Sequence, residues 1–136
     1  MQAAHNQGVS SDQVEAVKSQ LKRGYGHVHM IGIGGVGMAG LALHLAKRGF
    51  RVTGCDTGAG RITDWLVSHG ITLRRGHDES HIDREVDWVV HTAAVDADHD
   101  ELRKSRSLRI PVFTRGVVLP ALLEGQTSVA VSGTHG

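Results

Sequence analysis

A glycine-rich turn of six residues constrains this chain more than any other feature. Gly32, Gly34 and Gly37 match the pattern G-x-G-x-x-G, and they separate an apolar run, 27–31, from a helical pattern that begins at Met38. In such a strand–turn–helix unit the glycines permit a tight turn, a close approach of phosphate to the backbone, and close packing of helix on strand. The helix start also offers unpaired N–H groups and a positive dipole end to an anion. The turn therefore predicts a phosphate-binding site.

Strand-like runs alternate with helical patterns along the rest of the chain. The run Val86–His91 is nearly continuous in apolar residues, which is typical of a strand covered on both faces. Alternating strands and helices form a parallel sheet through right-handed crossovers. We therefore expect an α/β fold, a Rossmann-like parallel β-sheet with flanking helices in a single domain. The predicted strands are 27–31, 51–55, 71–74, 86–91, 110–113 and 128–131, and the helices between them are 38–48, 62–68, 98–107 and 116–124.

Residues 1–26, before the first strand, are predicted to form a loose tail and a short helix. Ser10 is placed to cap this helix, with Gln13 three residues later. Val14, Val17 and Leu21 recur at helical spacing and form a narrow apolar stripe. We expect the helix to lie on the surface of the domain.

Size and charge exclude several classes of protein. A chain of 136 residues can bury one core, and its 15 Lys and Arg against 14 Asp and Glu leave no basic excess for nucleic acid or a membrane surface. No apolar run approaches the roughly 18 residues that span a bilayer, and the N-terminus lacks a signal-peptide core. The single cysteine, Cys55, excludes an internal disulfide framework and agrees with a reducing cytosol. A soluble, cytoplasmic domain is predicted.

Ten histidines raise the question of a metal site. The closest candidate pairs are His27 with His29, and His77 with His81. Neither Cys-x-x-Cys nor His-Glu-x-x-His accompanies them, and His27 and His29 point the same way on one strand. We interpret the histidines as structural or solvated and predict no metal ligands.

Ligands of open parallel sheets bind at the carboxyl ends of the strands. Beyond the glycine turn, the residues at these ends are Asp56, Gly76-His77, Thr92–Ala94 and Arg115. In dinucleotide-binding folds an acid at the position of Asp56 bonds the ribose hydroxyls. The alternative is that Asp56 only caps the turn that follows it at Thr57-Gly58.

The turn and several later motifs resemble one enzyme family. The segment Ile31–Ala42, Ile-Gly-Ile-Gly-Gly-Val-Gly-Met-Ala-Gly-Leu-Ala, is similar to the opening signature of the UDP-N-acetylmuramate–L-alanine ligases, which attach the first amino acid of the peptidoglycan stem peptide. The resemblance covers roughly residues 27–136. It continues at Gly54-Cys55-Asp56 (usually Gly-Ser-Asp in the family), Thr63, Leu66, Gly76-His77, Thr92–Val95, Ile110–Val112, Arg115 and Gly133-Thr134-His135-Gly136.

The resemblance implies a role for each candidate residue in binding UDP-N-acetylmuramate, and it implies no catalytic residue. Asp56 would face the ribose or uracil, His77 would close the pocket, and Arg115 would contact phosphate or carboxylate. The diphosphate would lie on the backbone amides of the turn, and a second loop would complete the pocket. These two sets are Gly34, Gly35, Val36, Gly37 and Met38 in the turn, and Thr92, Ala93 and Ala94 in the loop.

The last four residues, Gly133-Thr134-His135-Gly136, resemble the first half of the family's Gly-Thr-His-Gly-Lys-Thr phosphate loop, without its Lys and Thr. We therefore expect 27–126 to be the UDP-N-acetylmuramate-binding domain and 127–136 to begin a central ATP-binding domain. On this interpretation the fragment alone is inactive and holds no cofactor. ATP and Mg²⁺ are expected for the full-length enzyme, and the partners are UDP-N-acetylmuramate and the central and C-terminal domains.

Two departures from the family pattern and three alternatives remain. Residues 96–101 read Asp-Ala-Asp-His-Asp-Glu without the family's Asn-Pro, and His91-Thr92 replaces a commoner Val-Ser. The glycine turn and Asp56 also suit an NAD- or NADP-binding domain of an oxidoreductase or a potassium-transport regulator. A sibling ligase that recycles a whole tripeptide onto UDP-N-acetylmuramate is the second alternative. A non-enzymatic nucleotide-sensing or assembly module is the third.

Overall fold

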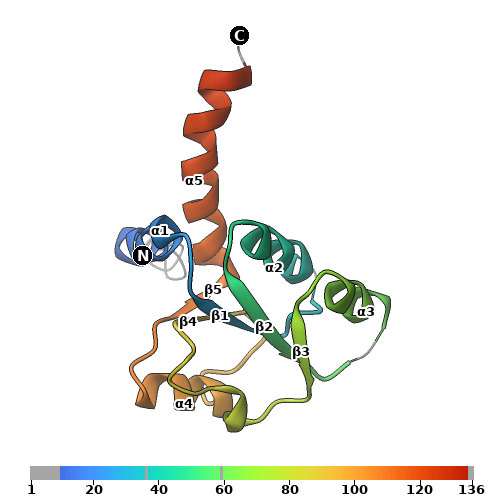
Figure 1. Ribbon diagram of the computed structural model, residues 1–136. Helices are drawn as coiled ribbons and strands as arrows, with labels where there is room; N and C mark the ends of the chain where they lie inside the picture. Colours follow the sequence, from blue (N-terminus) through green and yellow to red (C-terminus); the bar gives the residue numbers. More distant parts are fainter. Residues whose placement is uncertain (1–9, 36, 59, 135–136) are drawn as a thin grey trace.

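A five-stranded parallel sheet forms the centre of the fold (Figure 1). The computed structural model describes residues 10–35, 37–58 and 60–134, with the backbone alone for 125–134. The sheet order is β3-β2-β1-β4-β5, and every neighbouring pair is parallel. The predicted α/β fold class is thereby confirmed. The strands are β1 (His27–Ile31), β2 (Arg51–Asp56), β3 (Thr72–Arg75), β4 (Trp88–His91) and β5 (Val112–Thr114).

Helices cover both faces of this sheet. In Figure 1, α1, α2, α3 and α5 lie on one side, and α4 lies on the other with the short 3₁₀ turn η2 beside it. The chain runs outward from β1 through β2 to β3 and then returns to the other side of β1 as β4. This reversal opens a crevice at the carboxyl ends of β1 and β4, where such folds bind ligands. The helical elements are α1 (Ser11–Arg23), α2 (Met38–Lys47), α3 (Arg61–Ser68), η2 (Glu79–His81), α4 (Asp100–Ser107) and α5 (Arg115–Thr134).

The interior contains two cores, one on each face of the sheet, because successive side chains of β1 point to opposite faces. Val28 and Met30 face the larger core beneath α1, α2 and α5, whereas His29 and Ile31 face the side of α4. Trp88 is fully buried in the larger core. The smaller core contains Ile31, Cys55, Ile82, Val86, Val89, Leu102 and Ile110.

The N-terminal helix α1 is part of the larger core. Ser10 caps it, because its side chain accepts a hydrogen bond of 3.2 Å from the amide of Gln13. Val14, Val17 and Leu21 are buried, and α1 packs against α5. The apolar stripe predicted from their spacing therefore belongs to the interior rather than to the surface.

The prediction of a sixth strand at 128–131 is wrong in this structure, because α5 continues through these residues to Thr134. A short apolar run does not by itself distinguish strand from helix. A strand needs a neighbouring strand to pair its backbone groups, whereas a helix pairs its own. Within the described part of the chain, no helix is sufficiently long and apolar to cross a membrane.

Candidate functional site

The glycine turn is tied to the end of β2. The amides of Gly32 and Ile33 both donate to the carbonyl oxygen of Cys55, at 2.9 and 3.1 Å. Gly37 ends the turn with a φ of 81°, a left-handed conformation that favours glycine, and it is the N-cap of α2. A Cβ at Gly37 would lie 2.8 Å from Nη1 of Arg115, so a glycine here also lets the guanidinium lie against the turn.

Asp56 holds the turn from the side. Its Oδ2 accepts a hydrogen bond of 2.8 Å from the amide of Gly34, and its Oδ1 accepts one of 2.9 Å from the amide of Gly58. Both carboxylate oxygens thus act as caps, which is the alternative role that the sequence left open. The ribose or uracil contact stays a prediction.

A cleft of about 500 Å³ lies at the carboxyl ends of the strands. It brings together residues from the glycine turn, the end of β2, the loop after β3, the loop after β4 and the start of α5. Thr57 and Val95 also line it and were not predicted, although both directly follow residues that were. The predicted residues in its lining are Gly35, Asp56, His77, Thr92, Ala93, Ala94 and Arg115, and Gly32 joins them.

The remaining predicted residues lie beside or beneath this cleft. Gly34 lines an adjoining hollow with Asp56. Met38 is fully buried, so its side chain packs inside the domain and only its backbone can face a ligand. Val36 lies outside the described residues, as do His135 and Gly136. Gly133 and Thr134 are in the last turn of α5.

Arg115 is the principal cation of the cleft. Among the residues that the structure describes, no carboxylate lies within 4.0 Å of its guanidinium. Arg115 thus forms no ion pair with a protein carboxylate in these residues. A half-buried guanidinium without an anionic partner is suited to a phosphate or carboxylate of a ligand.

The amides of the turn are less free than the sequence suggested. Gly34 donates to Asp56, Gly35 to the carbonyl of Gly32 at 3.0 Å, and Met38 to the carbonyl of Gly35 at 3.0 Å. The first turn of α2 has no side-chain cap, because its N-cap is glycine. The helix start after Met38 is therefore where unpaired amides remain available for an anion.

A buried polar cluster lies under the cleft, on the side of α4. Its centre is Glu101, which is fully buried and accepts hydrogen bonds from the amide of Asp78 at 3.0 Å and from the thiol of Cys55 at 3.2 Å. Nε2 of His29 lies 2.9 Å from Oε1 of Glu101, and Nδ1 of His81 lies 3.2 Å from its Oε2. Sequence reasoning gave Glu101 no role, because its partners are distant along the chain.

Burial and hydrogen bonding act in opposite directions on the pKa of Glu101. Burial alone raises this pKa, but the hydrogen bonds from His29 and Cys55 outweigh it, so the pKa falls to about 2. Burial, reinforced by the neighbouring charge of Glu101, raises the pKa of the Cys55 thiol. The cluster without any bound ion therefore contains a carboxylate and a neutral thiol.

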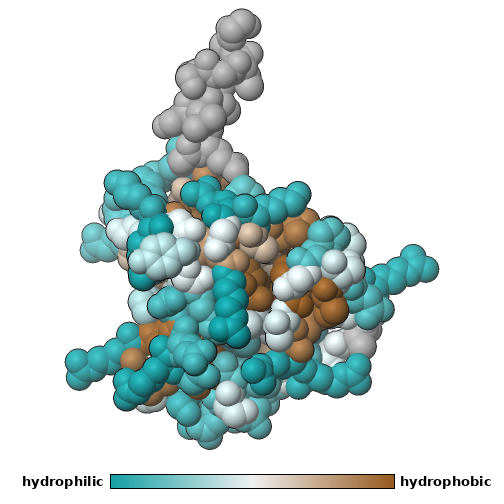
Figure 2. Space-filling view, viewed as in Figure 1, coloured by the Kyte–Doolittle hydropathy of each residue, from teal (hydrophilic) through white to brown (hydrophobic). Residues whose placement is uncertain are grey.

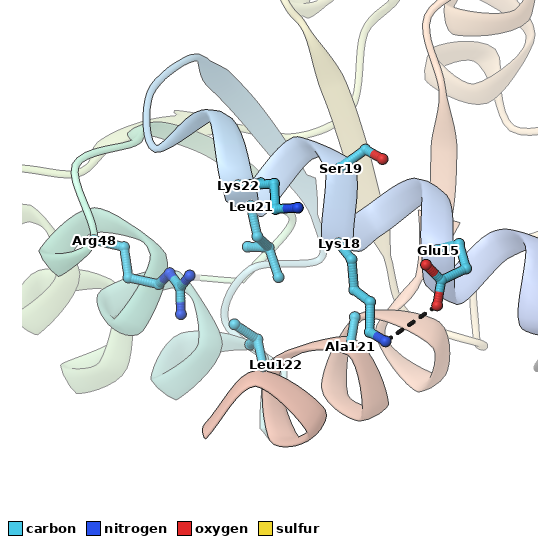
Figure 3. A pocket seen from close by; sticks show the side chains of 8 residues that line it. All are labelled: Glu15, Lys18, Ser19, Leu21, Lys22, Arg48, Ala121 and Leu122. Atoms are coloured by element: carbon cyan, nitrogen blue, oxygen red, sulfur yellow. Dashed lines mark hydrogen bonds and ion pairs between the residues drawn. The ribbon is translucent and has the colours of Figure 1, made fainter. Parts of the chain in front are cut away.

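A second cavity, of about 410 Å³, lies far from the glycine turn, between α1, α5 and the end of α2 (Figure 3). The Lys18 side chain extends from α1 toward α5 and forms ion pairs with Glu15, at 3.1 Å, and with Glu124. Because Glu15 and Glu124 already pair with Lys18, this lysine is less available to an anion than Arg115 is.

The fold and the cleft define an α/β domain of the Rossmann-like type, with its glycine turn at the point where the strand order reverses. Residues 27–127 match the family model described as "Mur ligase family, catalytic domain". The chain belongs to the Mur ligase family.

Similar curated proteins are named UDP-N-acetylmuramate–L-alanine ligase. The one from Acetivibrio thermocellus is 48% identical over 111 residues, which are 81% of this chain and 24% of that protein. The one from Methylibium petroleiphilum is 41% identical over 116 residues, 85% of this chain and 24% of that protein. The chain thus spans about a quarter of the length of these relatives.

Two solved structures share the fold. The UDP-N-acetylmuramate–alanine ligase of Thermotoga maritima has a TM-score of 0.68 at 31% identity, covering 72% of this chain and 23% of that one. The UDP-N-acetylmuramate:L-alanyl-gamma-D-glutamyl-meso-diaminopimelate ligase of Neisseria meningitides has a TM-score of 0.61 at 30% identity, covering 66% and 28%. Both ligase types therefore resemble the chain.

Replacing Asp56 by alanine is expected to lower the free energy of unfolding by about 1–3 kcal/mol, because the amides of Gly34 and Gly58 lose their acceptors. Chemical denaturation measures this effect. Asp64→Ala is the matched control on α3, since the Asp64 side chain forms no hydrogen bond within the described residues. Equal stability of the Asp56 variant and the wild type would show that the two caps are dispensable.

Proposed function

We propose that this domain binds the UDP part of UDP-N-acetylmuramate, as the N-terminal part of a UDP-N-acetylmuramate–L-alanine ligase. The observation that carries the proposal is the position of Arg115, an arginine without an anionic partner in the described residues, against a glycine turn at the mouth of a cleft. Membership of the Mur ligase family and the names of the relatives support the choice of ligand.

The cleft suits the parts of a nucleotide sugar. The diphosphate lies at the start of α2, where the helix dipole and uncapped amides favour negative charge, and Arg115 reaches it from α5. Asp56 sets the shape of the turn through the amide of Gly34. His77 and the loop Thr92–Ala94 form the walls that hold the nucleoside. In this orientation the lactyl carboxylate points toward another domain of the longer enzyme.

ATP and Mg²⁺ belong to the full-length enzyme on this proposal. Gly133 and Thr134 lie in the last turn of helix α5 in this structure, where backbone amides pair within the helix. We propose that ligation belongs to further domains and that this fragment has no ligase activity by itself. A cytoplasmic location stays a prediction.

The sibling tripeptide-recycling ligase is the second candidate, and the solved structure from Neisseria meningitides supports it. Both enzymes take UDP-N-acetylmuramate, so the cleft serves either one. We favour the L-alanine ligase because the similar curated proteins carry that name. In the full-length enzyme, an assay that offers L-alanine and the tripeptide in competition separates the two.

UDP-N-acetylmuramate and UDP are expected to raise the melting temperature of the domain, and NADH is expected to leave it unchanged. A ligand that binds only the native state must stabilise it. Arg115→Gln is expected to weaken UDP-N-acetylmuramate about ten- to hundredfold, the equivalent of one charge-assisted hydrogen bond. Arg84→Gln, an exposed arginine away from the cleft, is the control. Stabilisation by NADH alone would favour the oxidoreductase alternative over the proposal.

A further inference from the structure

Four metal-ligating side chains converge under the cleft, each from a different element. His29 comes from β1, Cys55 from β2, His81 from η2 and Glu101 from α4. One donor atom from each lies within 4.8 Å of the others. His29, Cys55 and Glu101 are fully buried, and the side chain of His81 is 8% exposed. The side chains thus converge on one point, two from the strands of the sheet and two from η2 and α4, which cover it.

Two of the donor spacings at Glu101 are slightly shorter than those of a tetrahedral zinc site. Bonds of about 2.0–2.1 Å to nitrogen or oxygen and about 2.3 Å to sulfur place neighbouring ligand atoms roughly 3.3–3.6 Å apart. Oε1 of Glu101 lies 2.9 Å from Nε2 of His29 and 3.2 Å from Sγ of Cys55. A lengthening of these two contacts by a few tenths of an ångström would match that geometry, and Nδ1 of His81 lies 3.2 Å from the other carboxylate oxygen, Oε2.

The charges of the four groups balance a dication. A thiolate from Cys55 and the carboxylate of Glu101 carry two negative charges, and His29 and His81 bind metals as neutral imidazoles. A divalent ion therefore makes the site neutral, which is the condition that a buried site favours. One sulfur, two nitrogens and one oxygen suit Zn²⁺, whereas Mg²⁺ and Ca²⁺ take oxygen ligands.

A chain of hydrogen bonds orients His29 from behind. Nδ1 of His29 and Nε2 of His27 each lie 2.8 Å from Oγ1 of Thr53, and Nδ1 of His27 lies 3.3 Å from the carbonyl oxygen of Glu85. That carbonyl only accepts, so Nδ1 of a neutral His27 carries the proton, and Thr53 donates to Nε2 of His27. Oγ1 of Thr53 then accepts from Nδ1 of His29. This leaves Nε2 of a neutral His29 unprotonated and facing the carboxylate of Glu101.

Two electron-pair donors that face each other at 2.9 Å require a cation between them. A proton on His29 satisfies that pair, and Cys55 and His81 approach the same carboxylate within hydrogen-bond distance, whereas one divalent ion would bind all four groups together. We propose that His29, Cys55, His81 and Glu101 form a structural site for Zn²⁺. Binding breaks the S–H bond of Cys55, forms the zinc–thiolate bond and releases the proton to solvent.

This site connects the layer of α4 to the binding cleft. The carbonyl of Cys55 accepts the amides of Gly32 and Ile33, so a ligand that holds Cys55 also steadies the glycine turn. His77, whose Nδ1 lies 3.1 Å from Sγ of Cys55, lines the cleft above. Zinc would thus hold η2 and α4 against the sheet and stiffen the floor of the cleft.

The 136-residue chain, stripped with a chelator and dialysed against ZnCl₂, is expected to retain one zinc per molecule and to melt at a higher temperature than the stripped form. Co²⁺ in place of Zn²⁺ is expected to give a thiolate-to-metal charge-transfer band in the near ultraviolet. Cys55→Ser, which keeps the size and a donor toward Glu101, is expected to lose that band and at least tenfold in zinc affinity. Thr53→Val is expected to lose about tenfold through the orientation of His29.

His69→Gln is the matched control, since this exposed histidine contacts Trp65 and Ser68 rather than the cluster. It is expected to bind both metals as the wild type does. Circular dichroism of the stripped proteins verifies that each variant is folded, and His81→Gln replaces Cys55→Ser if the latter is not. No bound zinc in the wild type, or equal zinc affinity in the wild type and the ligand variant, overturns the proposal and leaves a hydrogen-bonded cluster.

Discussion

Replacing Glu101 by alanine is expected to lower the free energy of unfolding by about 3–5 kcal/mol, the usual cost of removing one partner from a buried ionic network. The change leaves the amide of Asp78 without its acceptor and removes the carboxylate that contacts the thiol of Cys55 and the imidazole of His29. Urea denaturation with a chelator present measures the effect of the carboxylate alone. Glu79→Ala is the control, because its exposed side chain has only a 3.9 Å contact with Lys104 and is expected to change stability by about 0.5 kcal/mol or less.

The dependence of the free energy of unfolding on pH tests whether the ionised carboxylate of Glu101 is the source of this stability. The pKa of Glu101 is lowered from 4.5 to about 2 by folding, so its ionisation stabilises the folded state fully above pH 4.5. This contribution, about 3 kcal/mol for a shift of this size, is lost as the pH falls through about 2. Glu101→Gln keeps the shape without the charge and is expected to flatten the profile between these pH values. A wild-type loss of stability that survives in this variant would assign the titration to other groups.

The fold was predictable because its signals are local. The glycine turn, the apolar run Val86–His91 and the helical stripes each lie within a short segment. Most element bounds agree with the structure to within two residues. The residues of the cleft were predictable for a related reason: in a parallel sheet every strand ends at the same edge, so residues that directly follow strands meet there.

The buried cluster was not predictable in the same way. His29 and Glu101 are 72 residues apart and Cys55 and Glu101 are 46 apart, and no sequence period connects them. Histidines that are close in the sequence form the pairs 27/29 and 77/81. The structure instead brings one histidine of each pair, His29 and His81, together with Cys55 and Glu101. The connection from β3 to β4 brings His81, and the crossover from β4 to α4 brings Glu101, to His29 and Cys55 on the sheet.

Some apolar residues of the predicted helices lie on the surface of the domain rather than in its core. Figure 2 shows a mostly hydrophilic face on which apolar residues reach the surface near α2 and α3. On α3, Ile62 and Val67 are 48% and 54% exposed. The helix predicted at 62–68 is present in the structure, but an apolar side chain on a helix does not by itself show burial. Leu66 alone is buried on α3.

The shape of the glycine turn depends on a glycine outside the motif, Gly54 in β2. Ile33 of the turn is fully buried against it, and a Cβ at Gly54 would lie 2.5 Å from Cδ1 and 2.8 Å from Cβ of Ile33. Non-bonded carbon atoms do not approach so closely, so any side chain at this position must displace Ile33. Because Gly32 and Ile33 both donate to Cys55, that displacement moves the entire turn.

Gly54→Ala is therefore expected to lower the free energy of unfolding by about 1–3 kcal/mol, as overpacking of a core does, and to abolish measurable binding of UDP-N-acetylmuramate. Ile33→Gly removes the opposing atoms, so the double variant is expected to be more stable than the sum of the single changes by about 0.5–3 kcal/mol. Gly40→Ala is the control for stability: its Cβ would meet nothing within 4 Å, and alanine in α2 is expected to stabilise by about 0.5–1 kcal/mol. Urea denaturation and calorimetry measure both effects. Strict additivity of Gly54→Ala and Ile33→Gly would show that this contact does not set the position of the turn.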